Sequence, residues 1–231
     1  MPVKLSWKLL PLALGGMAGG LVALLVVVYV LTAWWSKPLF GFGAGGPDQP
    51  IDFPHTVHVE QAGIQCEFCH RNVTDGAAAT VPAVEQCLFC HKTVNGMPAQ
   101  GEEHPEIVKL LAHGGLGADG MADPELTPEP IDWERVHRVP DHVQFFHEPH
   151  IRYFTQTEEG RVETLRRAGS YNLPMSSPPE PGELVEASCA ICHGKVRAMD
   201  KVKQERRLKM GDCVDCHRDN DAPTDCVTCH Y

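Results

Sequence analysis

Residues 66–70 read Cys-Glu-Phe-Cys-His, and this C-x-x-C-H pentad occurs five times along the chain. The paired cysteines are Cys66 and Cys69, Cys87 and Cys90, Cys189 and Cys192, Cys213 and Cys216, and Cys226 and Cys229. The histidines that follow the pairs are His70, His91, His193, His217 and His230. The pentads use all ten cysteines of the 231 residues, so no thiol remains for a separate disulfide framework.

The spacing of the pentads is the signature of covalent haem c attachment. Two thiols three residues apart can reach the two vinyl groups of one porphyrin, and the adjacent imidazole can bind its iron. Zinc ribbons also pair cysteines, but they need no histidine after each pair. A thioredoxin-like motif occurs beside a βαβ pattern. The sequence therefore predicts five covalent haems c, with ten cysteine anchors and five proximal histidines.

Distal ligands for five irons must come from the other histidines. Two hexapeptides share the pattern F-x-H-x-x-H, at residues 53–58 and 145–150. Each pattern places two imidazoles on neighbouring turns, so that one short segment can ligate two haems. We therefore expect four distal ligands, which are His55, His58, His147 and His150.

The fifth distal ligand has several candidates. We favour His137, while His142 and His113 are the main alternatives, and Met199 or Met210 is a further one. A methionine would raise the potential of its haem relative to two histidines. His104 and His113 flank an expected helix over residues 105–112, so solvated positions at the helix ends explain them as well.

The N-terminal region contains 28 uncharged residues, Leu9–Ser36. About 20 apolar residues cross a bilayer, whereas the apolar part of a signal peptide has about 7–15. Lys4 and Lys8 precede this stretch, and Lys37 is the only Lys or Arg between it and Arg71. By the positive-inside rule, the sequence predicts a single-pass helix in the cytoplasmic (inner) membrane, with the haem part on the periplasmic side.

Composition and spacing predict the domain organisation. We expect a short N-terminus and transmembrane helix over 1–37, a linker over 38–52, a two-haem unit with an acidic insertion over 53–132, and a three-haem unit with a Pro-rich insertion over 133–231. The formal charge of −10 argues against a nucleic-acid-binding protein. With five haems to enclose, the outer part should bury mainly porphyrin surface, and the apoprotein should be largely unfolded.

The expected fold class is a multihaem cytochrome c, mostly irregular, with short α-helices and little β-structure. We expect helices after the haem motifs and around residues 105–112 and 197–208. A β-hairpin with its turn at Glu159-Gly160 fits Ile151–Leu165. The insertions at 95–134 and 160–188 read as long loops, and loops of that length are commonly functional, so we expect partner docking there.

These motifs carry a family resemblance. F-x-H-x-x-H followed by C-x-x-C-H resembles class III, cytochrome c3/c7-like, multihaem cytochromes. With one N-terminal membrane helix and five motifs, the whole chain is similar to the pentahaem cytochrome c subunit of alternative complex III. The run W-x-x-V-H-x-x-P-D-x-V-x-F-x-H-x-x-H from Trp133 to His150, followed by C-A-I-C-H-G, resembles a module of such cytochromes. The resemblance implies that His137, His147 and His150 bind haem.

The same resemblance implies partners. They are an integral-membrane quinol-binding subunit, an iron–sulfur subunit and a monohaem cytochrome c subunit of one complex. Electrons from menaquinol would pass through this chain to a soluble cytochrome, a copper protein or a terminal oxidase. The chain would then be an electron-transfer subunit without a catalytic site of its own.

Two other functions compete with this one. A NapC/NrfH-type cytochrome oxidises quinol itself, but such proteins have a haem motif soon after the membrane helix, whereas Cys66 here follows Lys37 by 29 residues. A multihaem reductase needs an open iron position, often with C-x-x-C-K, and all five pentads here end in histidine.

Overall fold

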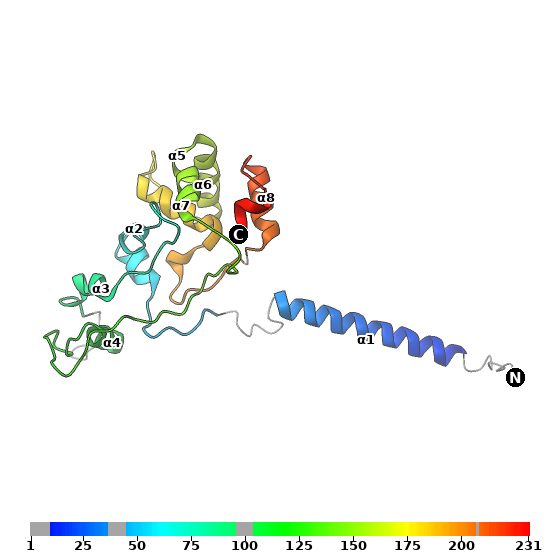
Figure 1. Cartoon of the computed structure of the whole chain (residues 1–231), viewed down its shortest axis with the longest axis horizontal. Coiled ribbons are helices and arrows are strands. Elements are labelled where there is room, and N and C mark those ends of the chain that lie inside the picture. Colours follow the sequence, from blue (N-terminus) through cyan, green and yellow to red (C-terminus); the bar gives the residue numbers. More distant parts are fainter. Residues whose placement is uncertain (1–9, 37–44, 96–103, 207) are drawn as a thin grey trace. The chain divides into compact units, whose positions relative to one another are not determined.

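The computed structural model describes residues 10–36, 45–95, 104–206 and 208–231. The chain divides into two compact units, Met1–Gly45 and Gly46–Tyr231. The boundary falls inside the expected linker. Both expected haem-binding regions, 53–132 and 133–231, lie in the second unit, shown from cyan to red in Figure 1.

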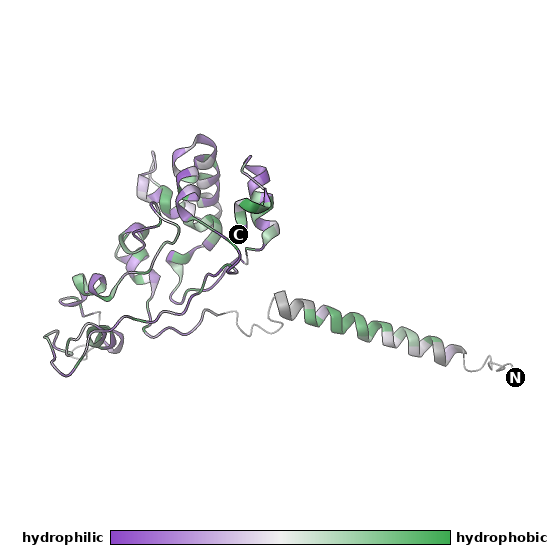
Figure 2. Ribbon diagram, viewed as in Figure 1, coloured by the Kyte–Doolittle hydropathy of each residue, from purple (hydrophilic) through white to green (hydrophobic). Residues whose placement is uncertain are grey.

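The first unit contains helix α1 (Leu10–Ser36), which has the length and composition to cross a membrane. It is apolar along most of its length (Figure 2), and none of its described side chains is buried. A helix that is apolar on every side has no polar face to present to water. It therefore fits a membrane anchor. Lys4, Lys8 and Lys37, which predict the orientation, lie outside the described residues.

The second unit is helical and irregular. It contains a π-helical turn (Thr56–Gln61), α2 (Cys66–Cys69), α3 (Val84–His91), α4 (Pro105–His113), α5 (His147–Gln156), α6 (Glu158–Tyr171), α7 (Pro181–His193), a 3-10 turn (Val196–Ala198), α8 (Met210–Asp219) and α9 (Cys226–Cys229). Its described β-structure consists of two isolated bridges, Leu116 with Ala122 and Val143 with His230. The expectation of short helices and little β-structure is confirmed.

The haem motifs lie on helices rather than before them. Each cysteine pair is helical, in α2, α3, α7, α8 or α9. On a helix, residues three apart are neighbours on one face. Helical backbone therefore brings the two thiols of each pair to the same side, where one porphyrin can reach both. The helix expected around 105–112 is present as α4.

The expected β-hairpin over Ile151–Leu165 is wrong, because these residues form α5 and α6. Thr157 separates the two helices, and its Oγ1 caps α6 by accepting a hydrogen bond from the backbone N–H of Gly160 at 3.1 Å. The buried positions of α6 are Gly160, Thr164 and Ala168, four residues apart. That period belongs to a helix with one buried face and not to a strand.

The expected long loop over 160–188 is also wrong, because most of it belongs to α6 and α7, and α5, α6 and α7 pack together. Pro181 stands in the first turn of α7, where its missing N–H costs no helical hydrogen bond. Glu183 accepts hydrogen bonds from the backbone N–H groups of Glu180 and Ser176. The Ser176 hydroxyl also donates to Glu183, at 2.6 Å. This hydroxyl is the largest cause of the lowered pKa of the Glu183 carboxyl, and the two backbone N–H groups add to it.

The expected helix over 197–208 is wrong as well. Among the described residues of that range, only Arg197 and Ala198 are helical, as part of the 3-10 turn Val196–Ala198. The described residues that follow make contacts to distant segments instead: Lys201 pairs with Asp48, and the Thr56 hydroxyl donates to Asp200. These long-range contacts tie the segment to residues near the start of the unit.

The apolar core is small and divided. The described residues form three buried clusters of three to five members, for example Val73, Ile151 and Val185, which join α5 and α7 to the segment after α2. Clusters of this size bury little apolar surface for a unit that spans 186 residues.

Candidate haem-binding site

The first hexapeptide holds its two histidines through one phenylalanine and one carbonyl. The Phe53 ring lies edge-on to the His55 ring at 5.0 Å between centroids, and it stacks on the His58 ring at 4.1 Å. His58 Nδ1 lies 2.9 Å from the carbonyl oxygen of Pro54, four residues earlier. Its Nε2 is thereby left free to bind a metal.

The second hexapeptide folds in the same way. The Phe145 ring lies edge-on to the His147 ring at 4.9 Å and at 33° to the His150 ring at 4.7 Å. His150 Nδ1 lies 2.7 Å from the carbonyl oxygen of Phe146, again four residues earlier. The repeated motif is therefore also a repeated local structure.

Five of the eight other histidines have a ring in contact with the histidine of a pentad, and four of these contacts each involve a different pentad. The distances between ring centroids are 6.0 Å for His58 with His91, 6.3 Å for His147 with His193, 6.0 Å for His150 with His217 and 5.4 Å for His142 with His230. Bonds from a metal to imidazole nitrogen are about 2.0–2.1 Å long, so two imidazoles on opposite sides of one iron have centroids about 6 Å apart. The residues present therefore fit bis-histidine haems.

The histidines come in pairs rather than in clusters. In the part of the chain that the structure describes, no group of three or more His, Cys, Asp or Glu side chains could hold a bare metal ion. A zinc site needs at least three protein ligands, whereas a haem brings four nitrogens of its own and needs two. Paired histidines beside paired cysteines fit haem.

Backbone carbonyls orient the rings. Seven of the expected ligands have Nδ1 within hydrogen-bond distance of a carbonyl oxygen: His58 with Pro54, His70 with Thr80, His91 with Val94, His147 with Ala77, His150 with Phe146, His217 with Pro223 and His230 with His142. Metal-binding histidines commonly donate their second ring N–H in this way. Nε2 of each ring is then the nitrogen that faces a metal.

His55 is linked to His70 by an electrostatic interaction that, second to burial, contributes to lowering the pKa of His55. Burial lowers the pKa of His55 to about 4, and burial likewise lowers the pKa of His193 to about 4. Both imidazoles are therefore uncharged at neutral pH, which is the form that binds a metal. The backbone N–H of His55 donates to the carbonyl oxygen of Met199 at 3.0 Å.

Two candidates for the fifth distal position, His137 and His142, have rings in contact with a pentad histidine. His137 lies edge-on to His193 with centroids 4.3 Å apart, too close for an iron between the rings, and its Nε2 is buried without a hydrogen-bond partner. His142 faces His230 with ring planes 13° apart. The geometry favours His142 over His137, because His142 faces a proximal histidine that has no other facing partner among the described residues.

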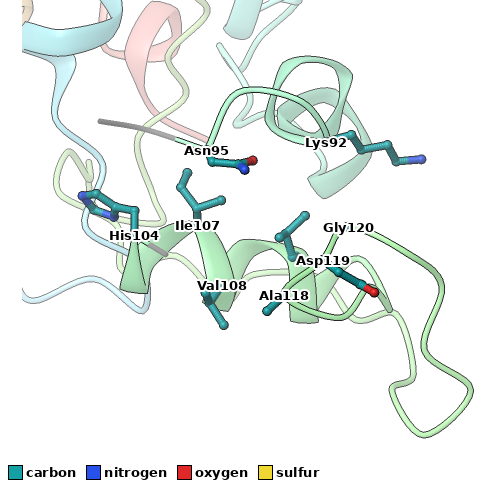
Figure 3. Close-up of a pocket in the computed structure, with 9 residues that line it drawn as sticks. Lys92, Asn95, His104, Ile107, Val108, Ala118, Asp119 and Gly120 are labelled. Carbon is teal, nitrogen blue, oxygen red and sulfur yellow. The ribbon is translucent and has the colours of Figure 1, made fainter. Parts of the chain in front are cut away.

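The remaining histidine candidates lie at the two ends of α4. His104 caps α4, where its Nδ1 accepts from the backbone N–H of Glu106 at 3.3 Å. His113 ends the same helix, and its Nδ1 lies 3.3 Å from the carbonyl oxygen of Glu129. Figure 3 shows the cavity beside His104, lined also by Lys92 and Asp119, with no second histidine in it. Met210 is exposed.

Several positioning groups were not singled out from the sequence. Phe53 and Phe145 each hold two ligands, and their presence at the same place in both hexapeptides was the available signal. The carbonyls of Ala77 and Thr80 orient His147 and His70. A carbonyl carries no sequence signal, so only the tertiary structure identifies these groups.

Thiols and imidazoles of this pattern define a class of protein, the multihaem c-type cytochromes. No protein-family model matches the chain. The chain is 25% identical to the menaquinone reductase multihaem cytochrome c subunit of Nitratidesulfovibrio vulgaris (strain Hildenborough), over 94% of this chain and 91% of that protein. This similarity supports a multihaem c-type cytochrome linked to quinone electron transfer.

Proposed function

We propose that the chain is a membrane-anchored pentahaem cytochrome c that transfers electrons within a quinone-linked membrane complex. The facing histidine pairs, each beside a cysteine pair, are the observation that carries the proposal. The proposed axial pairs are His55 with His70, His58 with His91, His147 with His193, His150 with His217 and His142 with His230. The ten cysteines are the proposed thioether anchors.

The protein's part in the function is ligation, orientation and burial. Haem supplies a one-electron change at iron. The chain provides two imidazoles for each iron, fixes most of them through backbone carbonyls and keeps buried rings such as His55 uncharged. Ligands on both faces leave no position open for a substrate. An electron carrier fits this arrangement better than a reductase.

The specific complex we propose is of the alternative complex III type. Its partners would be an integral-membrane quinol-binding subunit, an iron–sulfur subunit and a monohaem cytochrome c subunit. The chain would receive electrons derived from quinol and pass them to a periplasmic acceptor. The five motifs, the apolar helix α1 and the resemblance at residues 133–150 support this assignment.

The opposite direction is a second candidate. The similar protein is named as a subunit of a menaquinone reductase, a name that describes electron delivery to a quinone. The same row of ligands would serve either direction. A NapC/NrfH-type activity, in which the chain itself oxidises quinol, is a further alternative that the same experiment separates.

The proposed location is the cytoplasmic (inner) membrane, with α1 crossing it once, the N-terminus inside and the haem unit on the periplasmic side. The helix supports the anchor, and the lysines around it support the orientation. Haem attachment to C-x-x-C-H motifs outside the cytoplasm agrees with that side.

The test is purification of the haem-loaded chain from membranes in mild detergent. We expect five haems per chain by mass spectrometry and only low-spin ferric signals by EPR. Co-purification of quinol-binding and iron–sulfur subunits, and reduction of the haems by menaquinol only in that assembly, would support the complex. Reduction by menaquinol in the isolated chain would instead support the NapC/NrfH-type alternative. Menaquinone reduction by pre-reduced haems, without the reverse reaction, would support the second direction.

A further inference from the structure

Contacts between the haem motifs arrange them in one row. We propose, building on the function proposed above, that the haems form an unbranched relay in the order 2–1–3–4–5, numbered by motif along the sequence. Haem 2 and haem 5 are then its ends, through which electrons enter and leave. The order is not the sequence order, because haem 1 lies between haem 2 and haem 3.

Haems 1 and 2 are joined by the first hexapeptide. His55 interacts electrostatically with His70 of motif 1, and the ring of His58, three residues later, contacts the ring of His91 of motif 2. A second link is the Gln86 side chain of α3, which donates a hydrogen bond to the carbonyl of Phe68 in α2.

Haems 1 and 3 are joined by the segment that follows motif 1. The carbonyl of Thr80 orients His70 at 2.6 Å, and three residues earlier the carbonyl of Ala77 orients His147 at 2.8 Å. The His147 ring faces His193 of motif 3. One short stretch of backbone therefore positions a ligand of each haem.

The anchors of haems 1 and 3 also touch. Helix α2 contacts α7, and the side chains of Cys66 and Cys189 are close enough for each to shift the pKa of the other. The cluster of Val73, Ile151 and Val185 packs beside Cys189. Since thioethers stand at the porphyrin edge, this contact brings the edges of the two haems together.

Haems 3 and 4 share helix α5. His147 and His150 lie one turn apart on it and face His193 and His217. The Tyr153 hydroxyl, one turn further, donates to Asn220 after motif 4 at 2.9 Å.

Haems 4 and 5 are linked by two short segments. The Pro223 carbonyl lies 2.6 Å from His217 Nδ1, three residues before motif 5 begins. Gln144, between His142 and His150, donates from its backbone N–H to the Cys229 carbonyl at 2.9 Å.

Among the haem motifs, motif 2 has its described links to motif 1, and its other packing is against α4. Within the described residues, none of its hydrogen bonds or ring contacts reaches motif 3, and Figure 1 shows α2 between α3 and α7. Each proposed end carries an exposed apolar residue between its cysteines, Phe89 in motif 2 at 85% and Val227 in motif 5 at 77%, although Leu88 beside Phe89 is buried. In motif 3, Ile191 is 4% exposed. Both proposed ends therefore keep an exposed side chain, whereas motif 3 lies within the packing of α5, α6 and α7.

Two matched variants test the order, His58→Met at haem 2 and His55→Met at haem 1. A methionine ligand raises the potential of its haem, so a mild reductant delivers the first electron there. Ferrous low-spin iron has no unpaired electron, so each ferric haem next to the reduced haem loses one source of magnetic relaxation. Pulsed EPR on the haem-loaded, one-electron-reduced chain measures how many ferric haems relax more slowly, and this number is the number of neighbours of the reduced haem.

In the His58→Met variant the first electron stays on haem 2, and the proposed order predicts slower magnetic relaxation of one other haem, haem 1. In the His55→Met variant the electron stays on haem 1, and the order predicts slower relaxation of two haems, haem 2 and haem 3. The reverse counts would establish the sequence order 1–2–3 and overturn the proposal. Failure of the proposed function is read separately, from a wild-type chain that carries fewer than five haems or a high-spin iron.

An electron-microscopy map of the wild-type, haem-loaded chain gives an independent reading that needs no variant. We expect the iron of haem 3 to lie nearer to the iron of haem 1 than to that of haem 2. A shorter distance from haem 3 to haem 2 would overturn the order even if both variants failed to assemble.

Discussion

His142 and His137 illustrate how much depends on a single residue. They are five positions apart in the same irregular segment. The ring of His142 lies nearly parallel to the ring of His230, whereas the ring of His137 lies edge-on to the ring of His193. In the haem-loaded chain, we expect His142→Ala to produce one high-spin ferric haem per chain and His137→Ala to produce none. EPR spin quantification makes the comparison, and a high-spin signal from His137→Ala alone would return the fifth position to His137.

Phe145 makes a second prediction at this scale. Its ring contacts both His147 and His150, and aromatic pairs of this kind contribute about 0.5–1.5 kcal/mol beyond burial. We expect Phe145→Leu to keep all five haems but to shift the EPR g-values of the two haems that His147 and His150 would ligate, because both imidazoles lose the aromatic ring that packs against them. Phe146→Leu, at the adjacent position, is the matched control and should leave the g-values unchanged. Identical spectra for the two variants would contradict the positioning role.

At the scale of elements, the pairing of α5 with α6 depends on the cap at Thr157. Its Oγ1 accepts from Gly160 and also donates to the Tyr153 carbonyl at 2.7 Å, so one hydroxyl joins the end of one helix to the start of the next. We expect Thr157→Ala to lower the free energy of unfolding by about 1 kcal/mol, while Thr157→Ser retains the cap. Guanidinium unfolding of the haem-loaded chain measures both, and equal midpoints would show that the cap contributes nothing.

At the scale of the whole molecule, the three small apolar clusters predict dependence on haem. Without porphyrins, the paired histidines and cysteine helices lose the surface they would enclose. We expect the chain produced without haem attachment to show much lower far-UV circular dichroism per residue than the loaded chain, and rapid proteolysis. A native-like spectrum without haem would instead show that the protein clusters suffice.

The sequence by itself predicted the chemistry and the local modules. The pentads need only adjacent residues, and both F-x-H-x-x-H segments adopt one geometry because each is a single turn whose phenylalanine and i−4 carbonyl are local. Helix α1 was likewise readable from an uninterrupted apolar run. At Ile151–Leu165 the sequence interpretation was wrong, because burial of Thr164 and Ala168 against neighbouring helices, and not local pattern, selects the helix there.

Only the tertiary structure decided which distant groups meet. It places Ala77 against His147, Cys66 against Cys189 and His142 opposite His230, pairs separated by 70 or more residues. Such contacts follow from how α2, α5 and α7 pack, and carbonyl acceptors have no side-chain signature. Residue type determines which side chains can bind haem, whereas packing determines which distant histidines come into contact.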